Sequence, residues 1–333
     1  MTFKLFVDGS TRSLLAIFAL ALAQLLVATS AEAADTSYPS KPIRFLVTNG
    51  PGSGSDVMAR LIAHKLTEAW GQQVVVDNRP GAGGNIGGEI AANASPDGYT
   101  IMLVTSSNAI AMALFKKLNY DLRKDFSPIA RLGAAAYMLV VNPSLNVASV
   151  KDLIELAKSA PGKLNYASSN IGSGVHLAAE IFTSMTGTKI VHIPYRGLGA
   201  ALTGLMGKQV QMAFAITTAV TPHVKAGRLK ALGVSSLERS PLAPDVPAIS
   251  ESVPGYEAIG WYGVVAPRGT SSNIVAKANR DLIQAFNTTE VKDRLALLGV
   301  TPMTSTPRAF GVFIDRKIEE YRKVIKAAGI RLQ

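Results

Sequence analysis

Glycine- and hydroxyl-rich turns are the segments of this 333-residue chain whose residue types and spacing point to chemistry. There are four: residues 49–56 (Asn-Gly-Pro-Gly-Ser-Gly-Ser-Asp), 78–85 (Asn-Arg-Pro-Gly-Ala-Gly-Gly-Asn), 168–174 (Ser-Ser-Asn-Ile-Gly-Ser-Gly) and 195–199 (Tyr-Arg-Gly-Leu-Gly). Where such a turn leads into a helix, it presents free backbone N–H groups and the positive end of the helix dipole. The predicted chemistry is the binding of an anion. For any single turn, the alternative is that its glycines only permit a tight change of direction.

Nucleotide-binding loops and hydrolase motifs are missing from the sequence. The glycines at 81–84 do not reach G-x-G-x-x-G spacing because Ile86 occupies the third place, and residues 207–209 lack the rest of a P-loop. No G-x-S-x-G elbow and no H-E-x-x-H pair occurs, and the absence of cysteine excludes thiol catalysis and disulfides. We therefore predict no enzymatic activity, no cofactor and no metal site. His64 and His176 are expected to be structural.

The elements that must position these turns alternate between strand and helix. Strands are predicted at residues 43–47, 73–76 and 99–104. Residues 57–66 have the apolar spacing of a helix capped by Ser53 or Ser55, and residues 85–94 form the next predicted helix. Asp56 falls in the first turn of the first helix, where stabilisation by the helix dipole competes with a role as a general base. The order predicts a parallel, helix-covered sheet with the turns at its carboxyl edge, where open α/β folds bind ligands.

A second strand and helix series begins near residue 138. Its predicted strands cover residues 138–141, 164–167, 190–193, 210–214 and 229–234, and its helices cover 150–159, 175–186, 200–206 and 220–226. A strand at 261–266 then precedes helices at 272–286, 289–298 and 307–328, which have no sheet of their own and should pack back on the first lobe. The predicted fold class is therefore α/β, a two-lobed periplasmic binding protein fold with two helix-covered sheets and a double-crossover hinge. Lobe 1 is assigned to residues 38–137 and 264–333, and lobe 2 to residues 138–263.

The N-terminal segment has the pattern of a secretory signal. Lys4 and Arg12 stand in a polar start, residues 14–27 are apolar apart from one glutamine, and Ala31-Glu32-Ala33 forms an A-x-A cleavage site. The apolar run is short for a membrane span, which needs roughly 20 residues. We predict a signal peptide over residues 1–33, cleaved near Ala33, and a periplasmic mature protein. An uncleaved membrane anchor is the alternative.

The chain is basic, with 34 Lys and Arg against 23 Asp and Glu and a formal net charge of +11. The signal segment carries equal numbers of both signs, so the mature chain keeps this charge. Because the basic residues are scattered along the chain, we expect a solvated basic surface and no binding to nucleic acid.

With these turns in place, the sequence resembles the substrate-binding proteins of tripartite tricarboxylate transporters, also called Bug proteins. The matching segments run through nearly the whole mature chain: residues 38–44, 51–60, 78–87, 96–100, 166–169, 192–197 and 261–267. The resemblance implies a Venus-flytrap protein that closes on a small organic carboxylate and delivers it to the membrane permease subunits of such a transporter. It also implies a monomer. A sensory protein that presents its ligand to a membrane receptor is the alternative, and an exported hydrolase is disfavoured because no nucleophile and base are paired.

The resemblance assigns ligand binding to turns of both lobes, through backbone groups, hydroxyls and ordered water. The implied residues are Gly52, Ser53, Gly54, Ser55, Asp56, Ser106, Ser107, Ser168, Ser169, Gly172, Ser173, Tyr195, Arg196, Gly197 and Thr217. Trp261 and Tyr262, at the second crossover, are expected either to line the cleft or to pack the hinge.

Two positions depart from the family pattern. Ser53 stands where many relatives have an additional glycine, and Ala215 stands where many carry an acid. Without that acid, an ammonium group on the ligand would lose its partner. We therefore expect a carboxylate that has no α-amino group.

Overall fold

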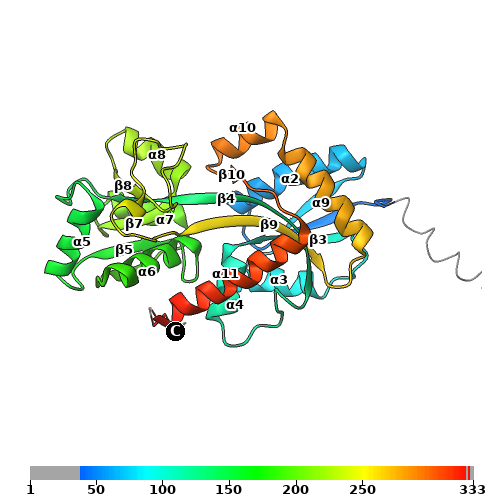
Figure 1. Cartoon of the computed structure of the whole chain (residues 1–333), viewed down its shortest axis with the longest axis horizontal. Helices are drawn as coiled ribbons and strands as arrows, with labels where there is room; N and C mark the ends of the chain where they lie inside the picture. The colour runs from blue at the N-terminus through cyan, green and yellow to red at the C-terminus, as the bar shows by residue number, and fades with distance from the viewer. Residues whose placement is uncertain (1–37, 328, 331–333) are drawn as a thin grey trace, which may run out of the picture. The chain divides into compact units, whose positions relative to one another are not determined.

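The structure, a computed structural model, describes residues 38–327 and 329–330 of the chain. The predicted signal peptide at residues 1–33 and its cleavage site lie outside this part. The described residues from Lys41 onward form one unit, which Figure 1 shows as two lobes joined by long strands. No helix of the described chain is long and apolar enough to cross a membrane.

The first lobe is built on a mixed sheet. Its strands are, in spatial order, β2 (Val74–Asn78), β1 (Ile43–Val47), β3 (Thr100–Thr105), β9 (Ile259–Pro267) and β4 (Phe126–Val141), with the short β10 (Thr301–Pro302) also paired to β4. The first three strands are parallel, as their order in the sequence predicted. Strand β9 runs antiparallel to both β3 and β4, so the complete sheet is not parallel.

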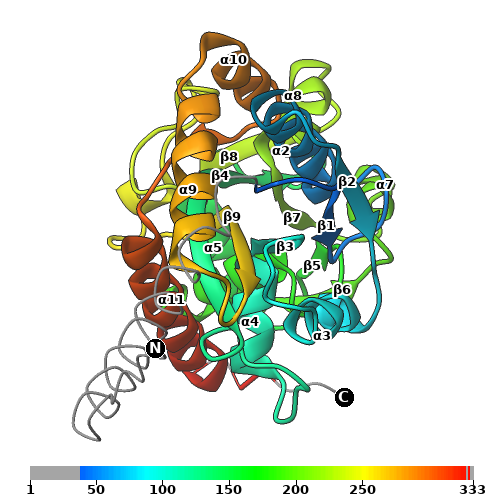
Figure 2. The ribbon, with the colours of Figure 1, turned by 90° about the vertical axis from the view of Figure 1, so that its right-hand side faces the viewer.

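Helices cover both faces of this first sheet (Figure 2). One face packs against α2 (Gly54–Trp70), α9 (Ser272–Phe286) and α10 (Thr289–Leu297), and the other against α3 (Asn85–Ala92), α4 (Ser106–Leu114) and α11 (Pro307–Ala327). Alternation along β1 directs Phe45 to the first face and Leu46 to the second, and both side chains are fully buried. Burial of one such side chain contributes about 1.5–3 kcal/mol. The C-terminal helices thus pack on the first lobe, as predicted.

The second lobe repeats this plan. Its sheet contains the end of β4 together with β5 (Asn165–Ser168), β6 (Val191–Pro194), β7 (Met212–Ile216) and β8 (Lys230–Val234). Helices α5 (Val150–Ser159) and α6 (Gly174–Thr186) cover one face, and α7 (Leu198–Met206) and α8 (Thr217–Lys225) cover the other. The two helix-covered sheets expected from the sequence are therefore present.

Strand β4 belongs to both sheets. Over its 16 residues it pairs with β9 from Phe126 to Ala136, and then with β7 from Tyr137 to Val141 and with β8 from Met138 to Val141. The strand predicted at residues 138–141 was therefore too short, because the structure extends it back to Phe126. Pro128 and Gly133 interrupt the strand pattern before Tyr137, and the alanines that follow Gly133 lack the β-branched side chains that mark a strand. Strand β9 carries the chain back, so two crossing strands connect the lobes. The lobe limits given above stay predictions.

Helix α4 was not predicted either. It begins directly after β3, where Thr105 and Asn108 form a capping box. In this box the Thr105 amide donates to Asn108 Oδ1 at 2.9 Å. Two short 3-10 helices, Ala82–Gly84 and Ile249–Glu251, were also missed. The remaining predicted elements agree with the structure to within a few residues at each end.

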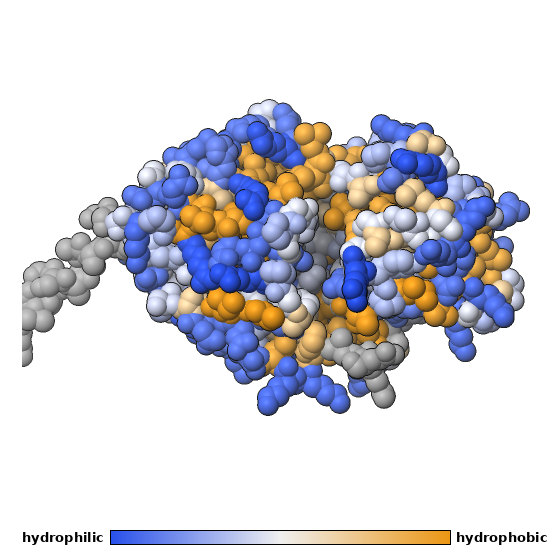
Figure 3. Space-filling view, turned by 180° about the vertical axis from the view of Figure 1, so that it is seen from behind, coloured by the Kyte–Doolittle hydropathy of each residue, from blue (hydrophilic) through white to orange (hydrophobic). Residues whose placement is uncertain are grey.

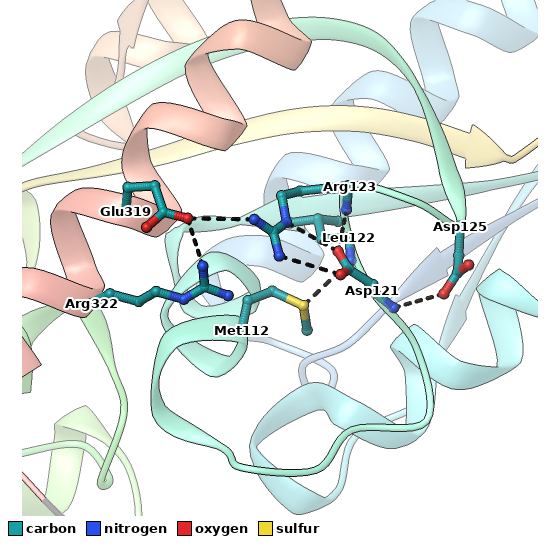
Figure 4. Close-up of polar contacts among 7 residues, drawn as sticks. All are labelled: Met112, Asp121, Leu122, Arg123, Asp125, Glu319 and Arg322. Carbon is teal, nitrogen blue, oxygen red and sulfur yellow. Dashed lines mark hydrogen bonds and ion pairs between the residues drawn. The ribbon is translucent and has the colours of Figure 1, made fainter.

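Helix α11 is linked to the rest of the first lobe by an ion pair and also contacts the second lobe. Figure 4 shows Glu319 of α11 between two arginines, Arg322 one turn further on and Arg123 of the connection before β4. Arg322 Nη1 donates to Glu319 Oε1 at 2.5 Å, and Arg123 Nη1 at 3.4 Å. Arg123 is held in turn by Asp121. Further along, α11 contacts α6, so one helix touches both lobes (Figure 1).

Candidate functional site

A cavity of about 990 Å³ lies between the two lobes. Figure 3, a view from behind Figure 1, shows the surface hollowed between them. The turns after β1, β2 and β3 line it from the first lobe, and those after β5 and β6 from the second. All four turns singled out in the sequence therefore reach one cavity, as expected for turns at the carboxyl edge of an α/β sheet.

The same three-residue pattern begins a helix on each side of this cavity. Residues 52–54 and 172–174 both read Gly-Ser-Gly, and both line the cavity. The leading glycines have φ of 76° and 80°, a region that only glycine enters freely. Ser53 caps α2 with φ −70° and ψ 159°, and Ser173 caps α6 with φ −73° and ψ 158°. Two helices of 17 and 13 residues thus point their positive ends into the same space.

Helices α4 and α7 also begin at the cavity. Ser106 and Ser107, the first residues of α4, line it, and so do Tyr195, Arg196 and Gly197, which lead into α7. Because Gly197 has no side chain, no side-chain cap accepts from the first amides of α7. Within the described chain, Arg196 is the one charged side chain on the cavity wall, and no carboxylate lines it.

Most of the implied ligand-binding residues line the cavity, and three do not. Those on the wall are Gly52, Ser53, Gly54, Ser55, Ser106, Ser107, Ser169, Gly172, Ser173, Tyr195, Arg196 and Gly197. Asp56, Ser168 and Thr217 lie behind it, each less than 4% exposed. These three residues therefore lie behind the turns that form the wall and do not line the cavity themselves.

Asp56 stabilises the turn after β1. Its Oδ2 accepts from the Gly52 amide at 2.9 Å and from Arg60 Nε at 3.1 Å. Burial alone would raise the pKa of Asp56, but the hydrogen bonds from Arg60 and Gly52 outweigh it and hold the pKa below its ordinary value. The carboxylate thus remains charged in the first turn of α2, the electrostatic role expected there.

Ser168 and Thr217 are likewise turned away from the cavity. Ser168 Oγ donates to the Asn170 carbonyl at 3.1 Å and lies 2.6 Å from His192 Nε2. Thr217 Oγ1 donates to the Ala136 carbonyl at 3.1 Å, across to β4. These contacts shape the turns that carry the lining residues.

Two histidines and a carboxyl group lie under the 168–174 turn. The rings of His176 and His192 stack with centroids 4.1 Å apart, and Tyr166 stacks on His192 at 4.8 Å. The Gly172 amide donates to His176 Nδ1 at 3.2 Å, which fixes His176 as a neutral acceptor. Tyr166 donates to Glu180. Burial, reinforced by His192, lowers the pKa of His176 to about 4, and burial lowers the pKa of His192 to about 4.

This pair predicts loss of stability in acid. An unfolded histidine titrates near pH 6.5, above the folded pKa of both residues, so the unfolded state binds more protons between pH 6.5 and about 4. The free energy of unfolding should therefore fall as the pH is lowered through this window, with a slope approaching about one proton per histidine. Burial raises the pKa of Glu180, which offsets part of the slope at its lower end. Urea midpoints measured from pH 7 to 4 give the slope.

Single variants show whether His176 and His192 cause that slope. His176→Gln and His192→Gln should each flatten it by about one proton. His64→Gln is the control, because His64 is exposed and paired with Glu68 at 3.2 Å. An unchanged slope in both buried variants would contradict the assignment.

Apolar and aromatic side chains complete the cavity wall. Trp261 and Tyr262 line it, and Trp261 also packs the hinge, because it is 1% exposed and its Nε1 donates to Tyr321 Oη at 3.3 Å. Leu114 and Phe115 line the wall as well and were missed, since they end a helix that the sequence did not reveal. Tyr137 was missed because it lies on the unpredicted part of β4.

Ala215 does not face the cavity. It is fully buried against α7, and its neighbour Ile216 lines the wall. The expectation of a ligand without an α-amino group therefore rests on the absence of acids from the described wall and not on Ala215 itself. Nowhere in the described chain do three or more His, Asp or Glu side chains gather to hold a metal ion.

The chain is similar over most of its length to known proteins of one family. The family described as tripartite tricarboxylate transporter family receptor matches residues 58–330. Over 320 residues the chain is 37% identical to Protein BugT of Bordetella pertussis, a match that covers 94% of this chain and 98% of BugT. An R. palustris protein solved with adipate is similar with a TM-score of 0.81 and 34% identity, over 88% of this chain and 99% of its own. MatC from Rhodopseudomonas palustris, solved with bound malate, is similar with a TM-score of 0.77 and 29% identity, over 86% of this chain and 100% of its own.

Proposed function

This chain belongs to the tripartite tricarboxylate transporter family of receptors, which are periplasmic solute-binding proteins and not enzymes, and we propose that it captures a small organic carboxylate between its lobes. Hinge movement about β4 and β9 closes the lobes on the ligand. The loaded protein then delivers the acid to the membrane permease subunits of a tripartite transporter. The mature protein is a periplasmic monomer, released by cleavage near Ala33.

The paired helix ends carry this proposal. Ser53 and Ser173 cap two helices whose positive ends share one cavity, and Arg196 adds a full positive charge beside them. A carboxylate between these groups can accept from backbone amides and serine hydroxyls, directly or through water. The volume of about 990 Å³ falls within the size of ordinary small-molecule sites.

The ligands of two relatives support the carboxylate class. Adipate and malate, found in the two R. palustris proteins, are both acids without an amino group. The described wall of this cavity has no acidic side chain that would pair with an ammonium group. Carboxylates of this kind are therefore the first ligands to test.

We predict that the protein binds deaminated acids more tightly than amino acids. Succinate and glutarate should bind about tenfold or more tighter than aspartate and glutamate, because an ammonium group buried without a partner costs at least ~1.4 kcal/mol. Calorimetry gives the affinities, and thermal stabilisation screens a wider panel of mono-, di- and tricarboxylates and aromatic acids. Preference for the amino acids would refute the deaminated class. A response to neutral or cationic solutes alone would refute carboxylate binding.

Delivery needs a test of its own. A strain lacking the gene should lose uptake of the labelled acid that binds the purified protein, and the gene supplied on a plasmid should restore it. Growth on other carbon sources is the control. Undiminished uptake in the deletion strain would refute the transport role.

A further inference from the structure

A second cavity, of about 560 Å³, adjoins the first. It is lined by α6 of the second lobe, by α11 and by the crossing strands β4 and β9, and we call it the α6–α11 cavity. Four residues line both cavities and so form the wall between them: Ser106, Tyr137, Gly174 and Trp261. A Cβ on Gly174 would collide with the Tyr137 hydroxyl, so this wall is closely packed.

Arg131 of β4 is the unusual residue of this cavity. Its Nε is buried without a hydrogen-bond partner, and its Nη2 donates only to the thioether of Met303, at 3.2 Å. The guanidinium stacks on Phe313 with 4.1 Å to the ring centroid. Among the residues that the structure describes, no carboxylate forms an ion pair with it. A guanidinium has five donors in a planar fork, so most of its bonding capacity is unused.

The surroundings of Arg131 increase its need for an anion. Four basic and two acidic side chains line the cavity, and one of the acids, Glu320, is already paired with Lys317 at 2.7 Å and with Arg316 at 3.7 Å. Burial, followed by the positive charge of Arg316, lowers the pKa of Arg131. The other acid, Glu257, forms no ion pair with Arg131 and offsets only part of this effect. The cavity thus holds a half-buried cation in a positive field, and its neutralisation would be favourable.

The remaining wall is apolar. Leu177 and Ile181 of α6, Val324 of α11 and Ile110 of α4 line it, together with Trp261 and Phe313. Such a surface gains free energy by covering alkyl or aryl groups. A fully polar anion would leave it uncovered, and a neutral hydrocarbon would leave Arg131 unpaired.

We propose that the α6–α11 cavity is a second ligand site, which binds a small amphiphilic carboxylate. Its carboxylate pairs with the planar fork of Arg131, where Met303, 43% exposed, can move aside. Its apolar chain or ring lies against Leu177 and Ile181. The site adjoins the larger cavity across the shared wall, and it does not depend on the function proposed for that cavity.

Octanoate, 1-octanol and acetate test the two halves of this proposal. Octanoate has both a carboxylate and an alkyl chain, whereas octanol lacks the charge and acetate lacks the chain. Calorimetry on the purified protein should show octanoate binding at one site, about tenfold or more tighter than either control compound. Equal binding of octanol would overturn the role of Arg131, and absence of octanoate binding would overturn the site.

Variants then locate the bound octanoate. Arg131→Gln should weaken it about tenfold or more, because it removes the charge-assisted pair, and Ile181→Trp should exclude it by filling the cavity. Arg316→Gln, at an exposed position that tolerates change, should weaken it a few-fold through the field alone. Arg294→Gln on α10, outside both cavities, is the matched control. Unchanged affinity in Arg131→Gln and Ile181→Trp, with loss in Arg196→Gln, would place octanoate in the inter-lobe cleft and refute the second site.

Discussion

Replacement of Ser53 by Asp is expected to weaken carboxylate binding at least about 100-fold without unfolding the protein. Aspartate is as good an N-cap as serine, so α2 should keep its start. The new carboxylate, however, stands on the cavity wall at the positive helix end. Two like charges about 5 Å apart repel by roughly 3 kcal/mol at an effective dielectric constant near 20, which corresponds to more than a hundredfold in affinity.

Two further variants isolate the charge. Ser53→Asn keeps a capping side chain without charge and should bind within a few-fold of the unmodified protein. Thr288→Asp adds the same charge at another N-cap, that of α10, away from the cavity, and should leave affinity unchanged. Calorimetry with the acid found in the panel provides the comparison. Tight binding by the Ser53→Asp variant would mean that the ligand does not meet the α2 helix end as an anion.

Replacement of Gly263 by Ala is expected to lower the free energy of unfolding by at least about 3 kcal/mol. Gly263 lies in β9, between β3 and β4. A Cβ there would stand 2.8 Å from the Ala130 carbonyl oxygen and closer still to the ring of Phe310. Phe310 is fully buried and the oxygen belongs to the neighbouring strand, so neither can yield cheaply.

Gly311→Ala is the matched control for this change. Gly311 lies inside α11, and a Cβ there meets only Pro128 Cγ, at an ordinary 3.4 Å. Alanine in a helix interior gains about 0.5–1 kcal/mol over glycine, so this variant should be slightly more stable. Urea unfolding of both variants measures the difference. Equal stabilities would show that β9 shifts to admit the methyl group.

The fold could be predicted where hydrophobic periodicity and caps agree. Helix α5 begins at a serine cap and keeps a regular apolar stripe, and its predicted limits match the structure. Strand β4 could not be predicted in full, because its middle lies between the lobes and contains Pro128, Gly133 and a run of alanines. These residues form a strand because β9 pairs with them, and this pairing depends on the tertiary fold.

The candidate site, too, could be predicted only where its residues belong to a local sequence pattern. Turns such as Gly52-Ser53-Gly54 could be found because glycine before an N-cap serine is a local signal. Whether a side chain in such a turn faces the ligand is not local: Ser168 turns to His192, which lies 24 residues further along the chain. Likewise, Leu114 and Phe115 reach the cavity through the position of α4, which no short pattern reveals.

The N-termini of α2 and α6, which face the cavity from opposite lobes, also affect closure of the ligand-free protein. Two like partial charges that face one space repel, so approach of the lobes without an anion works against electrostatics. A bound carboxylate acts as a shared counter-ion and turns this repulsion into attraction toward a common centre. Closure therefore depends on whether a ligand is bound. Under the delivery role proposed above, a permease that recognises only the closed form would not bind the ligand-free protein.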